Sequence, residues 1–171
     1  MKKIYTILAG LMLMSVSVSS MAQDQYKMQS VFVYNFTRMI AWPQAYQSGD
    51  FVIAVYGNSP IAREFQELAA TRMVGNQRIV VKTFNNIAEI EKSHILYVPT
   101  NQSRNINDIV GKLKSDRISA LVVTDARNAL TNGSVVNFLI EGGRQRYELS
   151  ESNARDMGLN LGSEMARLAI R

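Results

Sequence analysis

Apolar side chains recur at helical spacing over residues 26–43, YKMQSVFVYNFTRMIAWP. Val33 and Ile40 flank the main apolar face, so the pattern predicts a helix that is buried or covered on two sides. Pro43 is expected to end the helix, because the residue before a proline disfavours helical geometry. The main face on a helical wheel carries Met28, Val31, Phe32, Asn35, Phe36, Met39 and Trp42.

Asn35 is a polar residue inside that apolar face. A buried amide needs hydrogen-bond partners. We therefore expect Asn35 either to hold the helix against a neighbouring backbone by hydrogen bonds or to face a ligand or partner. Trp42 has two similar interpretations, as a plug of the core or as an anchor in an interface.

Four apolar runs then alternate with helical signals. The runs 50–57, 77–84, 94–100 and 120–125 predict buried strands. Helices are expected over 61–70, just after Asn86 and over 105–114, with Ser59 as the expected N-cap of the first and Asn86 as that of the second. This alternation predicts an α/β fold with a mostly parallel sheet flanked by helices.

The pattern changes in the last quarter of the chain. Residues 135–141 and 144–149 flank Gly142-Gly143, which predicts a C-terminal β-hairpin joining the sheet. Phe138 then faces Tyr147 on an apolar side of the hairpin. Its polar side carries the pairs Asn137–Glu148, Leu139–Arg146 and Glu141–Arg144.

Three shorter elements are expected after the hairpin. Ser150 is the predicted cap of a helix that Gly158 ends. Residues 159–161 are a candidate short strand, and Ser163 is the predicted cap of a last helix over 164–170.

The pattern of residues 1–22 indicates a segment that is not part of the fold. Lys2 and Lys3 precede the apolar stretch 4–14. Ser20-Met21-Ala22 fits the small-x-small pattern that precedes a signal-peptide cleavage site. This is the pattern of a secretory signal peptide cut after Ala22. Because no twin-arginine pair precedes the apolar stretch, Sec-type export to the periplasm is expected. Residues 23–171 are expected to form a single domain.

Composition narrows the function classes. The chain contains no cysteine, which excludes disulfides, thiol catalysis and thiolate metal sites. Without Lys2 and Lys3 the exported part holds 17 basic and 14 acidic residues, a net charge of +3. This mild charge, with no block of like charges, does not favour nucleic acid as a partner.

No enzyme active site is evident from the residues. His94 is the single histidine and begins a predicted strand, whereas sites in parallel α/β folds lie at the carboxyl ends of strands. The junction Gly57-Asn58-Ser59-Pro60 has no glycine-rich fingerprint, so ordinary capping is favoured over anion binding. Asp125 ends a strand and is more typical of a turn than of a hydrolase. We therefore predict no catalytic residue, no cofactor and no metal.

The order of several short segments resembles that of one family. Tyr34-Asn35-Phe36 is followed by Trp42-Pro43, a strand ending in Gly57, and residues 93–98, SHILYV. Val136-Asn137-Phe138, residues 141–144 (EGGR) and residues 159–163 (LNLGS) come next. These segments closely resemble the YfiR family, also known as DUF4154, and cover essentially the whole exported chain.

The resemblance implies a function as well as a fold. Members look like small periplasmic α/β proteins. The best-understood member binds the periplasmic sensor domain of an inner-membrane diguanylate cyclase and keeps cyclic-di-GMP synthesis, and with it biofilm formation, low. An OmpA-like outer-membrane lipoprotein can sequester that repressor, and the repressor forms dimers. The position of Ser93 is often a cysteine in the family, so redox control is not carried over to this chain.

The predicted binding surface combines one end of the first helix with the polar hairpin side. Tyr34 and Arg38 are four residues apart and so are expected to be neighbours beside Trp42. An alternative is a small-molecule sensor acting on a histidine kinase or an outer-membrane receptor, with its pocket near Asn35, Trp42 and Asn137. The residues predicted to bind a partner or ligand are Tyr34, Asn35, Arg38, Trp42, Asn137, Arg144 and Arg146.

Overall fold

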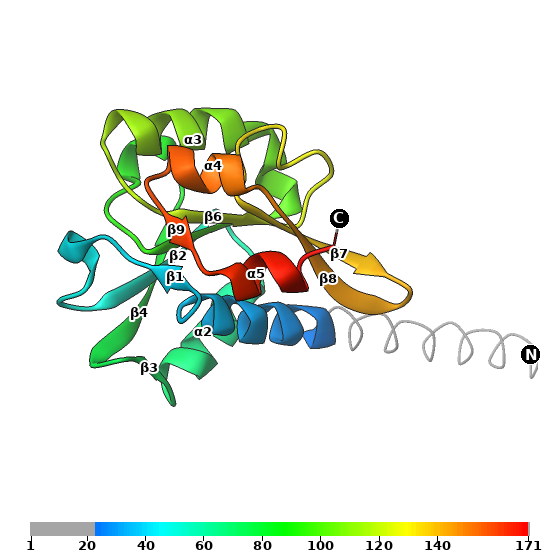
Figure 1. Ribbon diagram of the computed structural model, residues 1–171, viewed down its shortest axis with the longest axis horizontal. Coiled ribbons are helices and arrows are strands. Elements are labelled where there is room, and N and C mark those ends of the chain that lie inside the picture. Colours follow the sequence, from blue (N-terminus) through cyan, green and yellow to red (C-terminus); the bar gives the residue numbers. More distant parts are fainter. Residues whose placement is uncertain (1–22, 171) are drawn as a thin grey trace, which may run out of the picture.

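The computed structural model describes residues 23–170, which form a layered α/β structure around a central sheet (Figure 1). The predicted signal peptide lies outside these residues. Seven strands form the central sheet in the order β3-β4-β2-β5-β6-β7-β8, and β1 pairs with β9 in a small second sheet. The strands are β1 (Ile40–Ala41), β2 (Phe51–Tyr56), β3 (Met73–Val74), β4 (Gln77–Phe84), β5 (Ile95–Val98), β6 (Leu121–Thr124), β7 (Val136–Glu141), β8 (Arg144–Leu149) and β9 (Asn160–Leu161).

The central sheet is mixed. Strands β4, β2, β5, β6 and β7 run parallel, whereas β3 and β8 are antiparallel strands at the two edges. The expectation of a mostly parallel sheet was therefore wrong. It missed β3, which is two residues long and too short to show a hydrophobic period. The predicted hairpin does join the sheet, through β7.

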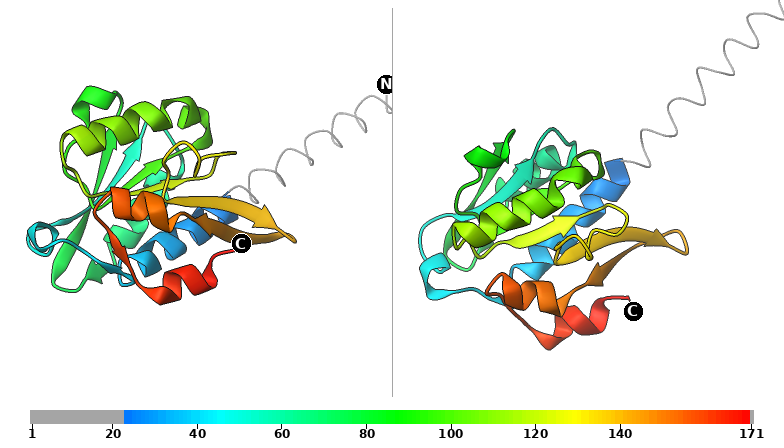
Figure 2. Two further views of the ribbon diagram at one scale, coloured as in Figure 1. Left: turned by 45° about the horizontal axis from the view of Figure 1, so that its top comes forward. Right: turned by 90° about the horizontal axis from the view of Figure 1, so that it is seen from above.

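Helices cover both faces of this sheet. The N-terminal helix (residues 23–36) lies across one face with α2, whereas α3 and α4 lie on the other, and α5 lies beside the N-terminal helix (Figures 1 and 2). Strands β5 and β6 are buried along their whole length. In the described part of the chain, no helix is long and apolar enough to span a membrane. The remaining elements are α2 (Ile61–Ala69), α3 (Ile106–Ser115), α4 (Glu151–Asp156), α5 (Ser163–Leu168) and the 3₁₀ turns η1 (Gln44–Tyr46), η2 (Ile87–Glu89) and η3 (Thr100–Asn105).

The C-terminal hairpin follows its prediction residue by residue. Phe138 pairs with Tyr147, and the three polar-side pairs are all present. Gly142 and Gly143 have φ angles of 56° and 73°, which is the left-handed conformation that a two-residue hairpin turn requires. Alternation of the side chains and the turn chemistry together determine this register.

The buried face of the N-terminal helix was predicted correctly only in part. Helical geometry stops after residue 36, well before Pro43, and Ile40 belongs to β1. Asn35 is exposed, and Met28 and Val31 are 49% and 47% exposed. Phe36 and the flanking Val33 are buried as predicted, and the other buried positions are the polar residues Gln29, Ser30 and Thr37.

Buried polar partners explain this rotation of the helix. Gln29 Oε1 accepts a 2.7 Å hydrogen bond from the Tyr97 hydroxyl inside the core. Ser30 and Thr37 hydroxyls donate to backbone carbonyls one turn earlier in their own helix, at 2.8 Å and 2.7 Å. Polar side chains that find partners can be buried at little cost. The predicted buried face left these three residues out because it counted mainly apolar residues.

The predicted helix caps are confirmed in two cases and wrong in two. Asn86 Oδ1 accepts a 3.2 Å hydrogen bond from the Glu89 N–H and caps η2. Ser150 Oγ accepts a 3.2 Å hydrogen bond from the Asn153 N–H and caps α4. Helix α5 begins at Ser163 itself, with Gly162 in the cap position. Helix α2 has Pro60 in the cap position, and Ser59 Oγ makes no hydrogen bond. Ser59 is therefore a buried hydroxyl without its expected partner.

Candidate partner-binding surface

Tyr34 and Arg38 form a compact patch where the N-terminal helix meets β3. The Tyr34 hydroxyl donates a 3.1 Å hydrogen bond to the carbonyl of Met73. The guanidinium carbon of Arg38 lies 4.6 Å from the centre of the Tyr34 ring, and that of Arg72 lies 6.0 Å away. Both distances fit cation–π contacts. Met73 is 52% exposed, so this Tyr34 patch combines an aromatic ring, two positive charges and an apolar side chain.

An exposed stripe runs along the outer side of the same helix. Met28, Val31 and Asn35 follow at spacings of three and four residues and all are exposed. The expected core role of Asn35 is therefore wrong. Its alternative role, facing a ligand or partner, stays a prediction. Scattered exposed apolar residues are common, but two on one helical stripe beside the Tyr34 patch make this the side of the helix open to a partner.

Trp42 plugs the core. Its Nε1 donates a 3.0 Å hydrogen bond to the carbonyl of Thr37. Its ring meets those of Phe51 and His94 edge-on, with centroids 5.4 Å and 5.3 Å away. The side chain is partly buried, with its N–H bonded and its ring packed on the core, which favours the first of its two interpretations.

Asn137 is also held inside the protein. It is 6% exposed, and its Oδ1 accepts hydrogen bonds from the Thr124 hydroxyl and the Ala126 N–H at 2.9 Å and 3.0 Å. Its Nδ2 donates to Glu148 at 3.2 Å. These bonds join β6, β7 and β8. Asn137 therefore ties strands together and is not available as part of an open recognition face.

Arg144 and Arg146 are exposed but lie far from the Tyr34 patch in the sheet order. They lie on β8, at one edge of the sheet, whereas the Tyr34 patch borders β3 at the other edge. Alternation along β8 also separates the two arginines from Gln145 and Tyr147, which contact the N-terminal helix. The structure therefore does not bring the predicted residues together into one surface, and their role in binding stays a prediction.

The alternative ligand pocket is not formed by its predicted residues. Asn35 is exposed, Trp42 packs on aromatic rings and Asn137 lies in the strand network, so the three do not line a common space.

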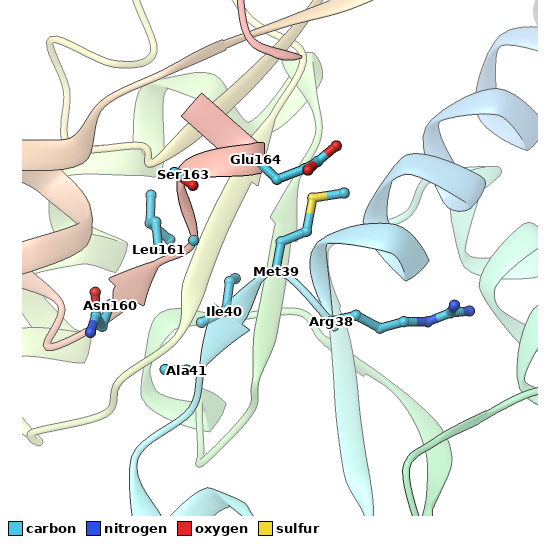
Figure 3. A pocket seen from close by; sticks show the side chains of 9 residues that line it. Arg38, Met39, Ile40, Ala41, Asn160, Leu161, Ser163 and Glu164 are labelled. Carbon is cyan, nitrogen blue, oxygen red and sulfur yellow. The ribbon is translucent and has the colours of Figure 1, made fainter. Parts of the chain in front are cut away.

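A larger cavity, of about 580 Å³, lies between the end of the N-terminal helix and α5 (Figure 3). Gly162 donates a 2.7 Å hydrogen bond to the carbonyl of Met39, and a Cβ at Gly162 would lie 3.0 Å from that oxygen. Figure 3 shows Met39 and Glu164 on one side of the cavity, while the Arg38 side chain extends away from them. The only trace of this cavity in the sequence was the glycine of the segment LNLGS. Hydrophobic periodicity cannot reveal that this glycine lies close to Met39.

His94 has a structural position. Its Nδ1 accepts a 3.0 Å hydrogen bond from the Val52 N–H, so the proton sits on Nε2, which donates to the carbonyl of Tyr46 at 2.8 Å. Burial lowers the pKa of His94, the Tyr46 carbonyl opposes this, and the Lys92 charge lowers the pKa further. Both ring nitrogens are occupied, so neither is open to a substrate.

Comparison with known proteins places the chain in a family. A model of the YfiR/HmsC-like family (DUF4154) matches residues 26–170. The chain belongs to the YfiR/HmsC-like family. No match to a curated protein is found. The resemblance seen in the short segments is thereby confirmed, and family membership indicates a periplasmic regulator of cyclic-di-GMP signalling rather than a catalyst.

Proposed function

We propose that this protein is a periplasmic binding protein that represses an inner-membrane diguanylate cyclase by binding its periplasmic sensor domain. The observation that carries the proposal is the match of the family across residues 26–170. Export by a signal peptide in residues 1–22 belongs to the same proposal. A repressor of this kind needs no chemistry of its own. It binds the inactive conformation of its target more tightly than the active one, and a nearly complete switch requires roughly 10⁴-fold preference.

The Tyr34 patch and the outer stripe of the N-terminal helix are the proposed contact surface. Tyr34 and Arg38 are held against each other, so little side-chain freedom remains to be lost on binding. Aromatic and arginine side chains dominate the binding energy of many interfaces. Met28 and Val31 add exposed apolar area next to them. Arg144 and Arg146 would contact a second partner or a second copy, since they lie at the other edge of the sheet.

The first test is made in cells. Deleting the gene should raise cellular cyclic-di-GMP and biofilm formation, and restoring the full chain should reverse both. A chain that lacks residues 1–22 should fail to reverse them, because it stays in the cytoplasm. Unchanged cyclic-di-GMP on deletion would contradict the cyclase assignment and favour a histidine kinase or an outer-membrane receptor as the output.

The second test addresses the surface. Arg38→Glu should weaken capture of the cyclase sensor domain by about tenfold or more, because it reverses a charge next to Tyr34. Arg155→Glu is the matched control, since Arg155 is exposed on α4, on the opposite face of the sheet. Crosslinking in the periplasm measures capture of the sensor domain by each variant. Equal capture by the two variants would show that the Tyr34 patch is not the contact surface.

A substitution on β8 distinguishes the cyclase from the other two proposed partners, a second copy of the chain and an OmpA-like lipoprotein. Arg146→Glu should leave cyclase binding intact and weaken either a homodimer or the contact with an OmpA-like lipoprotein. Analytical ultracentrifugation of the pure variant detects the first, and co-purification with the lipoprotein detects the second. Loss of cyclase capture by Arg146→Glu would instead place the cyclase on the β8 edge.

A further inference from the structure

The carboxyl ends of the parallel strands meet at a point where the strand order reverses. From β2 the chain passes through α2 to β4 on one side, whereas β5 pairs with the other side of β2. Open α/β sheets bind their ligands in the crevice outside such a reversal. In this protein the crevice is formed by residues 58–60 after β2, residues 99–101 after β5, and Asp125 after β6.

Tyr26 of the N-terminal helix closes this crevice and completes a cavity of about 260 Å³. Sites for drug-sized ligands enclose roughly 300–1,000 Å³, so an occupant of this cavity is smaller than those. The cavity is separate from the larger one between the N-terminal helix and α5.

Ser59 is the feature of this cavity that the fold does not explain. The residue is 6% exposed and lines the cavity, and its Oγ has no hydrogen-bond partner among the described residues. It does not cap α2, where Pro60 holds the cap position. A buried hydroxyl left unpaired opposes folding, so its presence at this position calls for a partner from outside the chain.

Asp125 supplies a fixed acceptor on the other side of the cavity. Its Oδ1 accepts hydrogen bonds from the Thr100 N–H and hydroxyl at 2.7 Å and 2.9 Å. These bonds hold the carboxylate at the carboxyl end of β6. Asn101 donates a 3.5 Å hydrogen bond to the carbonyl of Asn58, which joins the two loops at the rim.

Two phenols lie next to this carboxylate. Burial raises the pKa of Tyr26, and the Asp125 charge adds to the rise. The Ser59 hydroxyl partly offsets it, being close to the phenol although it does not meet hydrogen-bond geometry with it. Burial and then the Asp125 charge raise the pKa of Tyr97, whose hydroxyl is committed to Gln29. Tyr26 therefore stays a protonated hydroxyl at neutral pH, able to donate or accept a hydrogen bond in the cavity.

The charges at the crevice disfavour an anion. The Asp125 carboxylate repels an anion such as phosphate. The N-terminus of α2 carries the positive end of the helix dipole, about half a charge, which reduces the attraction of this carboxylate for a cation. A neutral hydroxyl needs no net charge at the site, because it can donate to Asp125 and accept from Tyr26 or Ser59.

We propose that this crevice binds a small neutral polyhydroxylated molecule, a monosaccharide or polyol, through Ser59, Asp125 and Tyr26. The proposal stands apart from the cyclase assignment, because binding of the small molecule is measured on the pure protein without any partner. Occupation of the site would tie the start of the N-terminal helix to the ends of β2 and β6.

Thermal unfolding of purified residues 23–171 tests the proposal directly. Glycerol, ribose, glucose and galactose are titrated at millimolar concentrations, with inorganic phosphate and ethanolamine as the anionic and cationic probes. At least one neutral probe should raise Tm by about 5–10 °C at a hundredfold excess over Kd. Stabilisation by phosphate or ethanolamine alone, or by no probe, would overturn the proposal.

Substitutions of the lining residues test whether the neutral probe binds in this crevice. Ser59→Ala and Asp125→Asn should each weaken binding of the neutral probe at least tenfold. Ser93→Ala is the matched control, because Ser93 Oγ is also buried without a partner but precedes β5 at the opposite end of the sheet. Ser59→Ala removes an unpaired group and should fold at least as stably as the wild type without probe. Undiminished binding in a folded Ser59→Ala variant would also overturn the proposal.

Discussion

The two ends of the parallel strands contain similar residue types and differ in whether a cavity lies beside the anchored titratable residue, His94 at one end and Asp125 at the other. At the amino end, His94 is enclosed by Trp42, Tyr46 and Phe51, with the Phe51 ring stacked 4.0 Å away, and both imidazole nitrogens are bonded. At the carboxyl end, Asp125 is also anchored, but a cavity remains beside it and the Ser59 hydroxyl is unpaired.

This difference shows how one sheet can serve stability and binding at once. The two bonds of the His94 imidazole at the amino end lock β2 to β5 and to the segment around η1. The unpaired Ser59 hydroxyl at the carboxyl end lowers stability slightly, but it lines a cavity where a ligand can pair with it. Mutations at the amino end should therefore act on folding, and those at the carboxyl end mainly on binding.

Removing the imidazole should give the largest effect on stability. We expect His94→Ala to lower the free energy of unfolding by about 3 kcal/mol, because it leaves a cavity and an unpaired Val52 N–H, and the Tyr46 carbonyl keeps only its hydrogen bond from Gln77 Nε2. Urea unfolding followed by circular dichroism measures the loss. A loss below about 1 kcal/mol would show that the amino end is not the locked region.

Lowering the pH should reduce the stability of the protein through the same residue, His94. Because the folded-state pKa of His94 is lowered, the unfolded chain binds the proton more readily. Stability is therefore complete above pH 6.5 and falls as the pH drops below it, by up to about 1.4 kcal/mol per pH unit. Urea unfolding at a series of pH values measures the slope. His94→Gln should flatten it over the first units below 6.5, and an equal slope in that variant would assign the effect to other groups.

A smaller effect is expected near the carboxyl end. Tyr97→Phe deletes the hydroxyl that donates to the fully buried Gln29, at a cost of about 1–2 kcal/mol. Its ring still packs on Phe65, so the loss should not approach that of His94→Ala. Thermal unfolding compares the two variants, and a loss as large as that of His94→Ala would remove the distinction between the two ends.

The two unpaired serines should show the smallest effects. Ser59→Ala and Ser93→Ala each remove a buried hydroxyl without a partner, so both should be neutral or stabilising by up to about 1 kcal/mol. Thermal unfolding with and without the neutral probe then separates them, since only Ser59→Ala should reduce stabilisation by the probe. Destabilisation by either change would show that its hydroxyl is paired in solution.

Much of the sheet was predictable from the sequence. The strand over 77–84 and the hairpin register were predicted residue by residue, because an apolar run between turn signals and a two-glycine turn are local patterns. The family was also predictable, since its short segments occur in order along the chain. Hydrophobic periodicity likewise placed a helix near the start of the exported chain.

Only the tertiary structure decided which side of that helix faces the core. Gln29 is buried because Tyr97, a residue distant in sequence, offers it a hydrogen bond, and Met28 and Val31 are exposed as a result. The separation of the Tyr34 patch from Arg146, and the meeting of Tyr26, Ser59 and Asp125, likewise depend on strand order. The sequence by itself determined local patterns, whereas pairing between distant polar groups determined the surfaces, because such pairs form only once the chain has folded.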